Sequence, residues 1–279
     1  MIPPTKNLWQ CIKNSTHYLN QHGIENAKRE IEWFCKKTFQ FSLIDIKSNK
    51  HITLTNNDFL ILISFLKRRS QHEPFQYILN SAPFYNNNFY INPHVLIPRP
   101  ETEVMIEVLK GKFFTKALDI GAGCGNIGIT LCTEKIVDSV TLIDISEEAL
   151  KVAKKNAQLL NINNINFHNI DVFKYKPKKK YDLVVSNPPY IGLKEYNELP
   201  PHIKQFEPRI ALTDCKDGYE FYKYLANHIN DFLTLNGTML LEIGLEETKD
   251  KIESFFTNSC NFIWHKDLNG AYRIFEINV

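Results

Sequence analysis

The hydrophobic positions of the chain follow two different patterns. The N-terminal part carries apolar side chains at the spacing of amphipathic helices, which predicts helices over residues 8–19, 26–38 and 57–70. From Lys116 onward, short apolar runs alternate with helical stretches, which is typical of a parallel sheet with helices on both faces. The sequence therefore predicts a small helical domain followed by a doubly wound α/β domain.

Seven short apolar runs are the candidate strands of this sheet. They cover residues 117–120, 139–144, 164–168, 181–186, 238–243, 262–265 and 272–277. Helical stretches, most clearly 147–160, intervene among the first five, so those strands are expected to be parallel. The last two runs are too close for a crossover helix and should form an antiparallel hairpin at the sheet's edge. The predicted fold class is α/β, with a doubly wound, mostly parallel, seven-stranded and Rossmann-like sheet.

A segment of different character joins the two parts. Its β-prone runs are 77–79, 84–85 and 89–91. Asn and Pro clusters separate these runs, which predicts a β-hairpin linker. After it, Pro98–Glu103 should open a helix that continues to about Lys110, because proline suits the first turn and acids suit the helix N-terminus. The predicted domains are 1–73 (helical), 74–98 (hairpin linker) and 99–279 (α/β).

Composition excludes several classes of protein. The formal net charge of +2 gives no general case for binding nucleic acid, and the run Lys178–Lys180 is expected to be a solvated loop. The six cysteines contain no C-x-x-C pair, so neither a zinc cage, a disulfide framework nor any other metal site is predicted. They are Cys11, Cys35, Cys124, Cys132, Cys215 and Cys260. Without a secretory pattern at Met1–Lys6 or an apolar run of membrane-spanning length, the expected location is a reducing cytoplasm.

A glycine-rich loop follows the first strand of the predicted sheet and opens a helix. Gly121, Gly123 and Gly125 allow a tight turn and let a ligand lie against bare backbone. Dinucleotide-binding enzymes carry a similar loop, so the loop alone does not identify the ligand. Asp119 is expected to point into the loop, where it would repel a pyrophosphate but balance an ammonium group. A cofactor with an amino-acid end therefore fits better than NAD.

Acidic residues also end the next two strands. Asp144 follows the glycines at the spacing from which a carboxylate takes ribose hydroxyls, although it could instead cap the following helix. Asp171 could bind an adenine amine while Val172 or Phe173 packs on the ring, or it could be an ordinary loop acid. These loops share the carboxyl ends of the strands, which is where open α/β sheets bind ligands.

The sequence Asn187-Pro188-Pro189-Tyr190 leaves the end of a buried strand as one stiff unit. The prolines fix two backbone angles, and such a unit suits a planar group bearing an NH₂, with Asn187 as acceptor and Tyr190 over its face. The alternative is a proline-rich turn without a ligand. Together with the adenosine and ammonium contacts predicted above, the nearby amide acceptor indicates S-adenosylmethionine as cofactor.

Several segments together carry a resemblance to a known family. They are Glu73–Ile78, Val95–Glu103, the glycine loop, Ser186–Ile191, Phe206–Pro208, Asp217–Gly218, Asp267–Gly270 and Arg273. Over nearly its whole length the chain resembles the class I S-adenosylmethionine-dependent methyltransferases. More narrowly, it resembles the release-factor glutamine methyltransferases of the PrmC or HemK type. Enzymes that methylate the exocyclic amine of adenine share Asn-Pro-Pro-Tyr, whereas the segments around Arg99 and Glu207 are more specific to the release-factor group.

The resemblance implies methylation of the side-chain amide of the glutamine in the Gly-Gly-Gln motif of class 1 peptide release factors. The methyl donor would be S-adenosylmethionine, the product S-adenosylhomocysteine, and residues 1–73 would help to recognise the factor. The implied cofactor contacts are Gly121, Ala122, Gly123, Cys124, Gly125, Asp144, Val172 and Asn187. Asn187, Pro188, Pro189 and Tyr190 would hold the glutamine, with Asn187 and Tyr190 as the catalytic residues.

Two positions depart from the family pattern. Relatives often have an aromatic residue where Val172 stands, so stacking could pass to Phe173. The usual glycine of the Ala-Leu-x-Gly segment is replaced, since Ala211-Leu212 leads into Thr213-Asp214, and a changed loop is expected. Two other functions remain open, an adenine-amine methyltransferase acting on DNA or RNA and a non-catalytic translation-factor binding protein. The preferred interpretation is a monomer without direct contacts to nucleic acid or a membrane.

Overall fold

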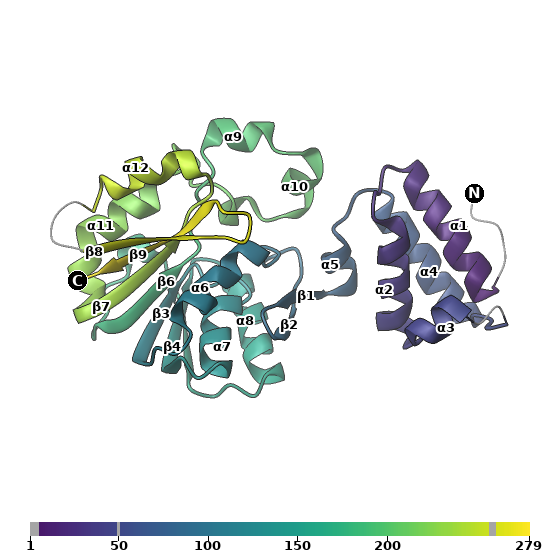
Figure 1. The fold of residues 1–279 in the computed structure, drawn as a ribbon, viewed down its shortest axis with the longest axis horizontal. Helices are drawn as coiled ribbons and strands as arrows, with labels where there is room; N and C mark the ends of the chain where they lie inside the picture. Colours follow the sequence, from purple (N-terminus) through teal and green to yellow (C-terminus); the bar gives the residue numbers. More distant parts are fainter. Residues whose placement is uncertain (1–5, 49–50, 257–260) are drawn as a thin grey trace. The chain divides into compact units, whose positions relative to one another are not determined.

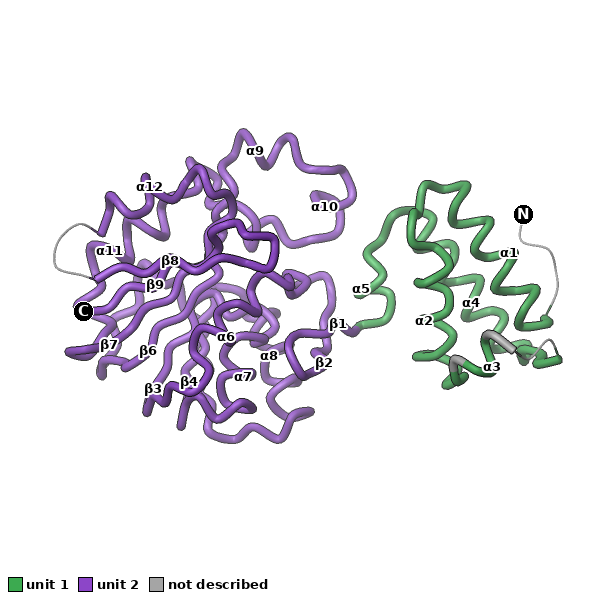
Figure 2. The backbone as a smooth tube through the Cα atoms, viewed as in Figure 1, with its two compact units in different colours: residues 1–80 green, residues 81–279 purple. Residues whose placement is uncertain are grey.

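The structure is a computed structural model that describes residues 6–48, 51–256 and 261–279 (Figure 1). The chain divides into two compact units, residues 1–80 and 81–279 (Figure 2). Cys260 and residues 1–5, considered above, lie outside the described residues. No helix in the described part is both long and apolar enough to cross a membrane.

The first unit is helical, as predicted. Its helices are α1 (Leu8–Gln21), α2 (Ala27–Phe39), α3 (Leu43–Ser48), α4 (Asn56–Arg69) and α5 (Phe75–Leu79). Thr55 starts α4 with a capping box, because its hydroxyl accepts from the Asp58 amide while the Asp58 carboxylate accepts from the Thr55 amide. The Phe34 and Phe65 rings stack with centroids 4.1 Å apart in the apolar core between α2 and α4.

One β prediction in this unit is wrong. Residues 77–79 lie in α5, which starts after Pro74 and ends at Asn80 in the left-handed conformation (φ 49°). A run of three apolar residues is too short to show the hydrophobic period that distinguishes a strand from a helix. Here Pro74 before the run and Asn80 after it favour a single helical turn. The predicted hairpin is confirmed: β1 (Ser81–Phe84) pairs antiparallel with β2 (Asn87–Tyr90) and belongs to the second unit. The domain limits 73/74 and 98/99 remain predictions.

The second unit contains the predicted seven-stranded sheet. Its strands are β3 (Phe114–Ile120), β4 (Val137–Asp144), β5 (Ile165–Asn169), β6 (Tyr181–Ser186), β7 (Leu233–Glu242), β8 (Asn261–Lys266) and β9 (Tyr272–Asn278). In space the order is β5-β4-β3-β6-β7-β9-β8. The pairs from β5 to β7 are parallel, whereas β9 is antiparallel to both β7 and β8, which confirms the predicted fold class and edge hairpin.

Helices cover both faces of this sheet (Figure 1). The helices α6 (Glu103–Leu109), α7 (Asn126–Thr133) and α8 (Glu147–Leu159) lie on one face, and α11 (Glu220–Phe232) and α12 (Lys249–Glu253) on the other. Alternation along the strands explains the two cores: Val184 and Met239 pack with Tyr222 of α11, whereas Asp119 and Leu142 contact α7 at Gly128. The shorter helical segments are η1 (Pro100–Thr102), η2 (Val172–Lys174), α9 (Leu193–Glu198), α10 (Pro201–Phe206), η3 (Arg209–Ala211) and η4 (Glu246–Thr248).

The strand order determines where a ligand can bind. From β3 the chain first adds β4 and β5 on one side of the sheet, and then returns to place β6 on the other side of β3. The loops after β3 and β6 therefore diverge at a topological switch point, where open α/β sheets leave a crevice at the carboxyl ends of the strands. The glycine loop and Asn187 follow these two strands.

Candidate functional site

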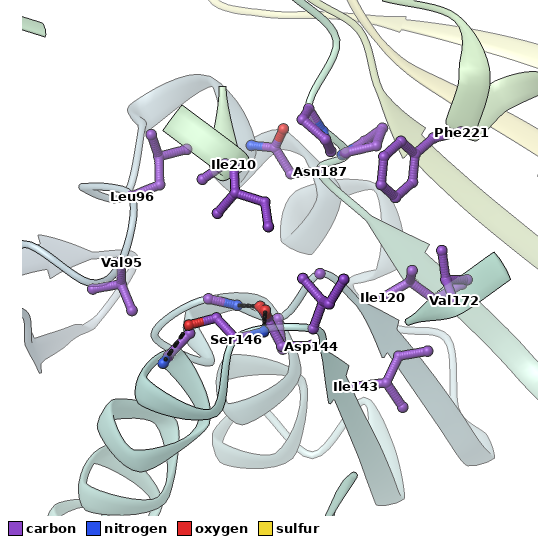
Figure 3. Close-up of a pocket in the computed structure, with 18 of the residues that line it drawn as sticks. Val95, Leu96, Ile120, Ile143, Asp144, Ser146, Val172, Asn187, Ile210 and Phe221 are labelled. Atoms are coloured by element: carbon purple, nitrogen blue, oxygen red, sulfur yellow. Dashed lines mark hydrogen bonds between the residues drawn. The ribbon is translucent and has the colours of Figure 1, made fainter. Parts of the chain in front are cut away.

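A cavity of about 600 Å³ lies at the carboxyl ends of the central strands (Figure 3). Its lining comes from the loops after β3, β4, β5 and β6, from residues in the segment 94–102, which includes η1, and from residues in the segment 209–221, which includes η3 and the start of α11. Apolar side chains form most of the wall, and a few polar groups converge on it. Asn187 and Asp144 lie on opposite sides of this space (Figure 3). The size and composition suit a cofactor or other small molecule.

Asp144 organises the glycine loop at the cavity. One carboxylate oxygen accepts from the Gly123 amide at 2.9 Å and the other from the Ser146 amide at 2.8 Å. The alternative role of Asp144 as a helix cap is excluded, because the Ser146 hydroxyl caps α8 by accepting from the Ala149 amide. Burial raises the pKa of Asp144, and these backbone N–H groups counteract part of the rise. Asp144 thus presents a carboxylate with spare acceptor capacity to the cavity.

The remaining glycine-loop residues divide into lining and supporting positions. Gly121, Ala122, Gly123 and Cys124 line the cavity, whereas Gly125 does not. Gly125 adopts φ 81° at the start of α7, where a Cβ would lie 2.7 Å from Ile129 Cδ1. Its glycine is therefore required by the turn and by helix packing rather than by space for a ligand.

Asp119 does not face the cavity, contrary to the sequence-based expectation. The alternation along β3 directs its carboxylate toward α7, where one oxygen accepts from the Gly128 amide at 2.9 Å. The other oxygen is buried without a hydrogen-bond partner among the described residues. Burial raises the pKa of Asp119 to about 7. Asp119 therefore supports the start of α7 from behind the loop and is not placed to balance an ammonium in the cavity.

An apolar slot lies beside Asp144. Val172, which is 5% exposed, lines it together with Phe173, which is 42% exposed and packs on Phe221 and Tyr224 with centroids 5.1 and 4.9 Å away. Asp171 also lines the cavity and caps η2 by accepting from the Phe173 amide. Sequence reasoning missed Ile145, which lines the cavity yet is 52% exposed. The sequence feature that could have identified Ile145 is its position directly after Asp144, the acid that ends the buried strand β4.

The Asn187 side chain is held by a residue far away in the sequence. Its Nδ2 donates to Thr102 Oγ1 at 3.1 Å, so its Oδ1 is the atom left to accept a hydrogen bond. The preceding Ser186 hydroxyl donates to the Ile120 carbonyl at 2.8 Å, which ties the end of β6 to β3. Pro188 and Pro189 continue the cavity wall. The structure therefore brings Asn187, Pro188 and Pro189 together with the cofactor-loop residues.

Tyr190 lies next to this wall but does not line the cavity. Its ring packs so closely on the backbone of Gly244, just after β7, that a Cβ there would lie 2.5 Å from Tyr190 Cδ2. The guanidinium of Arg273 donates to the Gly244 carbonyl, and Asp267 accepts from Arg273 Nε at 3.0 Å. Burial raises the pKa of Tyr190, so the phenol is neutral at physiological pH. These contacts fix the ring as a packing surface.

Replacing Gly244 by alanine should disturb this surface. The added methyl group would overlap the Tyr190 ring, and a clash in packed structure costs about 1–3 kcal/mol unless the ring moves. We expect a lower urea midpoint, with Gly192→Ala as the glycine control. Gly192 has a negative φ (−64°), and the nearest atom to a Cβ there is the Asp217 carbonyl oxygen at 3.4 Å. Equal losses in the two variants would contradict the proposed overlap.

Two of the segments that carry the family resemblance contact each other. Arg99 Nη2 lies 2.7 Å from both carboxylate oxygens of the buried Glu207. At Asp214, which stands where the family pattern has glycine, the carboxylate accepts from the backbone amides of Gly218 and Glu220 and so closes the loop. The change of this loop relative to the family stays a prediction.

Glu242, at the end of β7, is another buried acid near the site. It is 2% exposed, and burial raises its pKa to about 7, while the Thr102 hydroxyl and Arg273 partly oppose this rise. Between the unfolded-state pKa near 4.5 and this value, the folded state binds more protons than the unfolded state. The free energy of unfolding should therefore fall as the pH rises through this window.

Urea unfolding of the wild type and of Glu242→Gln tests this expectation. From about pH 5 to about pH 8, the free energy of unfolding of the wild type should decrease more than that of the variant, which cannot titrate at this position. Asp119 titrates in the same window in both proteins and so cancels from the comparison. Parallel pH dependences for wild type and variant would contradict the raised pKa of Glu242.

Comparison with known proteins identifies relatives along most of the chain. Residues 100–199 match the methyltransferase small domain family, and residues 10–79 match the PrmC N-terminal domain family. A release factor glutamine methyltransferase of Fusobacterium nucleatum is 36% identical over 245 residues, which are 86% of this chain and 69% of the relative. One of Geobacter sulfurreducens is 30% identical over 260 residues, 92% of this chain and 91% of the relative.

The sheet order, the glycine loop at the switch point and the family matches define a methyltransferase of class I. Within that class, the similarity extends through the helical unit as well as the sheet. The chain belongs to the release factor glutamine methyltransferase family.

Proposed function

We propose that this protein transfers a methyl group from S-adenosylmethionine to the side-chain amide nitrogen of the Gly-Gly-Gln glutamine in class 1 peptide release factors. The observation that carries the proposal is the Asn187 side chain, whose NH₂ is engaged by Thr102 so that Oδ1 is left to accept from a substrate NH₂. The names of the relatives supply the identity of the substrate. The chemistry required of the site is recognition of an amide beside a methyl donor.

The residues present fit S-adenosylmethionine. The Asp144 carboxylate suits ribose hydroxyls, and the slot at Ile145 and Val172 suits a purine ring. The bare backbone of Gly121 and Gly123 leaves space for the amino-acid end, because a Cβ at either position meets nothing within 4 Å. Val172 is the buried wall of the slot and Phe173 the exposed one, so the purine would contact both. When bound, the cofactor supplies a methyl group on a positively charged sulfur.

An amide nitrogen is a weak nucleophile, because its lone pair is delocalised into the carbonyl group. The protein must therefore orient the glutamine and accept the charge that develops on its nitrogen. Asn187 Oδ1 and the Pro188 carbonyl would each accept one hydrogen of the substrate NH₂, which aims the lone pair away from both acceptors. The rigid prolines keep the acceptors in place. Tyr190, whose ring packs on Gly244 and does not line the cavity, would support this wall from behind. The departing proton would pass to water.

The competing substrate is an adenine amine of DNA or RNA, which presents a similar NH₂. The relatives do not favour it, and a nucleic-acid substrate requires cationic contacts to phosphates, for which a formal net charge of +2 offers little. A non-catalytic role is opposed by the intact arrangement of Asp144 and Asn187 around one cavity. We further propose that the protein acts as a monomer in the cytoplasm, where release factors work.

Mass spectrometry tests the proposal. Purified protein and S-adenosylmethionine are incubated in three separate reactions, with a class 1 release factor, with DNA and with RNA. We expect one methyl group on the glutamine of the release factor and none on either nucleic acid. Label in nucleic acid alone would support the adenine alternative. Calorimetric binding of the cofactor without transfer to any substrate would support the non-catalytic role.

A further inference from the structure

We infer that three exposed leucines beside the cavity, Leu193, Leu245 and Leu268, form a docking surface for the body of the protein substrate. The inference rests on the proposed function, because it assigns this surface to the release factor whose glutamine enters the cavity. Leu193 starts α9, Leu245 follows β7, and Leu268 lies in the turn between β8 and β9. None of the three lines the cavity, so a bound cofactor does not account for their apolar character.

The exposed apolar side chains of the second unit are concentrated at one edge of its sheet. Among its described residues, ten large apolar side chains are exposed, and six of them lie in segments that follow the carboxyl ends of strands. The six are Ile145, Phe173, Leu193, Ile210, Leu245 and Leu268. Single exposed leucines are common on protein surfaces, whereas a concentration of apolar side chains around a binding cavity indicates an interaction site.

Tyr190 connects the two loops that carry Leu193 and Leu245. Its ring packs on Gly244, the residue before Leu245. Leu193 follows Tyr190 in the same loop, and the Leu193 amide donates to the Lys216 carbonyl at 2.9 Å. Lys216 itself lines the cavity. Leu193 and Leu245 therefore adjoin the cavity wall that Tyr190 supports.

Leu268 lies on a rigid turn at the same edge of the sheet. Since β7 and β8 are both antiparallel to β9, the turn after β8 is at the end where β7 finishes (Figure 1). The Asp267 carboxylate accepts from two backbone amides of the turn and from Arg273 Nε at 3.0 Å. The guanidinium of Arg273 also donates to the Gly244 carbonyl, which ties the turn to the end of β7. A fully exposed leucine on a fixed backbone loses little conformational freedom when a partner binds it.

The chemistry of this edge fits a protein partner better than a nucleic acid. Lys216 and Arg273, which lie beside the leucines, are paired with the carboxylates of Glu220 and Asp267. Cations engaged in this way are poorly suited to phosphates, whereas exposed leucines suit the apolar centre of a protein interface.

The reach of the substrate side chain identifies which protein would cover the docking surface. Only two methylene groups separate the amide of a glutamine from its backbone. When that amide reaches Asn187, the backbone of the release factor must therefore lie at the mouth of the cavity. The loops next to the mouth then face the body of the same factor, so the docking surface continues the site proposed for the glutamine.

Leu268→Ser tests the inference without disturbing the core, because this side chain is 105% exposed. We expect the Kd for a class 1 release factor, measured by calorimetry on protein loaded with S-adenosylhomocysteine, to rise about 10-fold, the effect of one leucine buried on binding. The values of kcat at saturating release factor and of the cofactor Kd should stay within about twofold of wild type, since the contact is made equally before and during methyl transfer. Leu235→Ser is the matched control, because Leu235 is 88% exposed near the amino end of β7, at the opposite edge of the sheet.

A double variant, Leu245→Ser with Leu268→Ser, strengthens the test, because removing two contacts of one surface should weaken binding further than either change alone. An unchanged release-factor Kd in the double variant, or an equal loss of affinity in Leu235→Ser, would overturn the inference. Sedimentation equilibrium covers the other occupant: self-association of the wild type that the double variant abolishes, with an unchanged release-factor Kd, would assign the surface to a second copy of this chain. A wild-type protein that neither binds nor methylates a release factor would instead refute the proposed function, so the two failures are distinguishable.

Discussion

Replacing Asn187 by alanine is expected to lower kcat for release-factor methylation by about 10²- to 10³-fold, the usual cost of removing one group that stabilises charge in a transition state. The reason is that Oδ1 is a side-chain acceptor that the structure leaves available at the cavity, since Nδ2 is bound to Thr102. The backbone carbonyl of Pro188 remains, so some turnover should survive. Steady-state and single-turnover assays with labelled cofactor measure the change.

The same variant should bind S-adenosylmethionine with nearly wild-type affinity. Asp144 and the glycine loop hold their positions through hydrogen bonds that do not involve Asn187. Calorimetry of cofactor binding therefore separates lost catalysis from lost folding, and Asn88→Ala supplies an exposed asparagine as control. A variant with near-normal kcat would refute the role of Asn187, whereas a large loss of cofactor affinity would show that its role is mainly in cofactor binding.

Local sequence signals were sufficient to predict most of the fold. β6 has the predicted bounds, Tyr181–Ser186, because a buried run of β-formers ends at a proline pair that no sheet can continue. The hairpin of β8 and β9 was predictable because the connection between the two apolar runs is too short for a crossover helix. Residues 77–79 were assigned to a strand in error, since one helical turn between Pro74 and Asn80 is set by its caps and not by a hydrophobic period.

The site was only partly accessible from sequence. The carboxyl ends of β3, β4, β5 and β6 identified the cavity, but the direction of each side chain depends on register and packing. Asp119 faces α7 because alternate residues of β3 point to opposite faces of the sheet, and no sequence motif specifies which face a given residue takes. The contact between Thr102 and Asn187 joins residues 85 positions apart and is a product of tertiary structure. Long-range contacts of polar side chains leave no periodic trace in a single sequence, whereas short loops at strand ends do.

Replacing Asp144 by alanine should weaken the other half of the site. The variant loses the carboxylate available to ribose. The amides of Gly123 and Ser146 also lose the acceptor that holds the glycine loop. Hydrogen bonds to a charged group contribute about 1.5–3 kcal/mol each, so we expect the cofactor Kd to rise about 10- to 150-fold. Asp138→Ala, an exposed acid at the opposite end of β4, is the control.

The kinetic signatures of the two variants should differ in kind. Saturating cofactor should restore much of kcat in Asp144→Ala, because Asn187 and its hydrogen bond to Thr102 are intact, whereas no cofactor concentration should restore Asn187→Ala. A wild-type cofactor Kd in Asp144→Ala would refute the assignment of Asp144 to cofactor binding. If Asp144→Ala instead lost kcat at every cofactor concentration, the glycine loop would have to act on the methyl-transfer step itself. The division of the cavity into a cofactor wall at β4 and an amide wall at β6 would then be wrong.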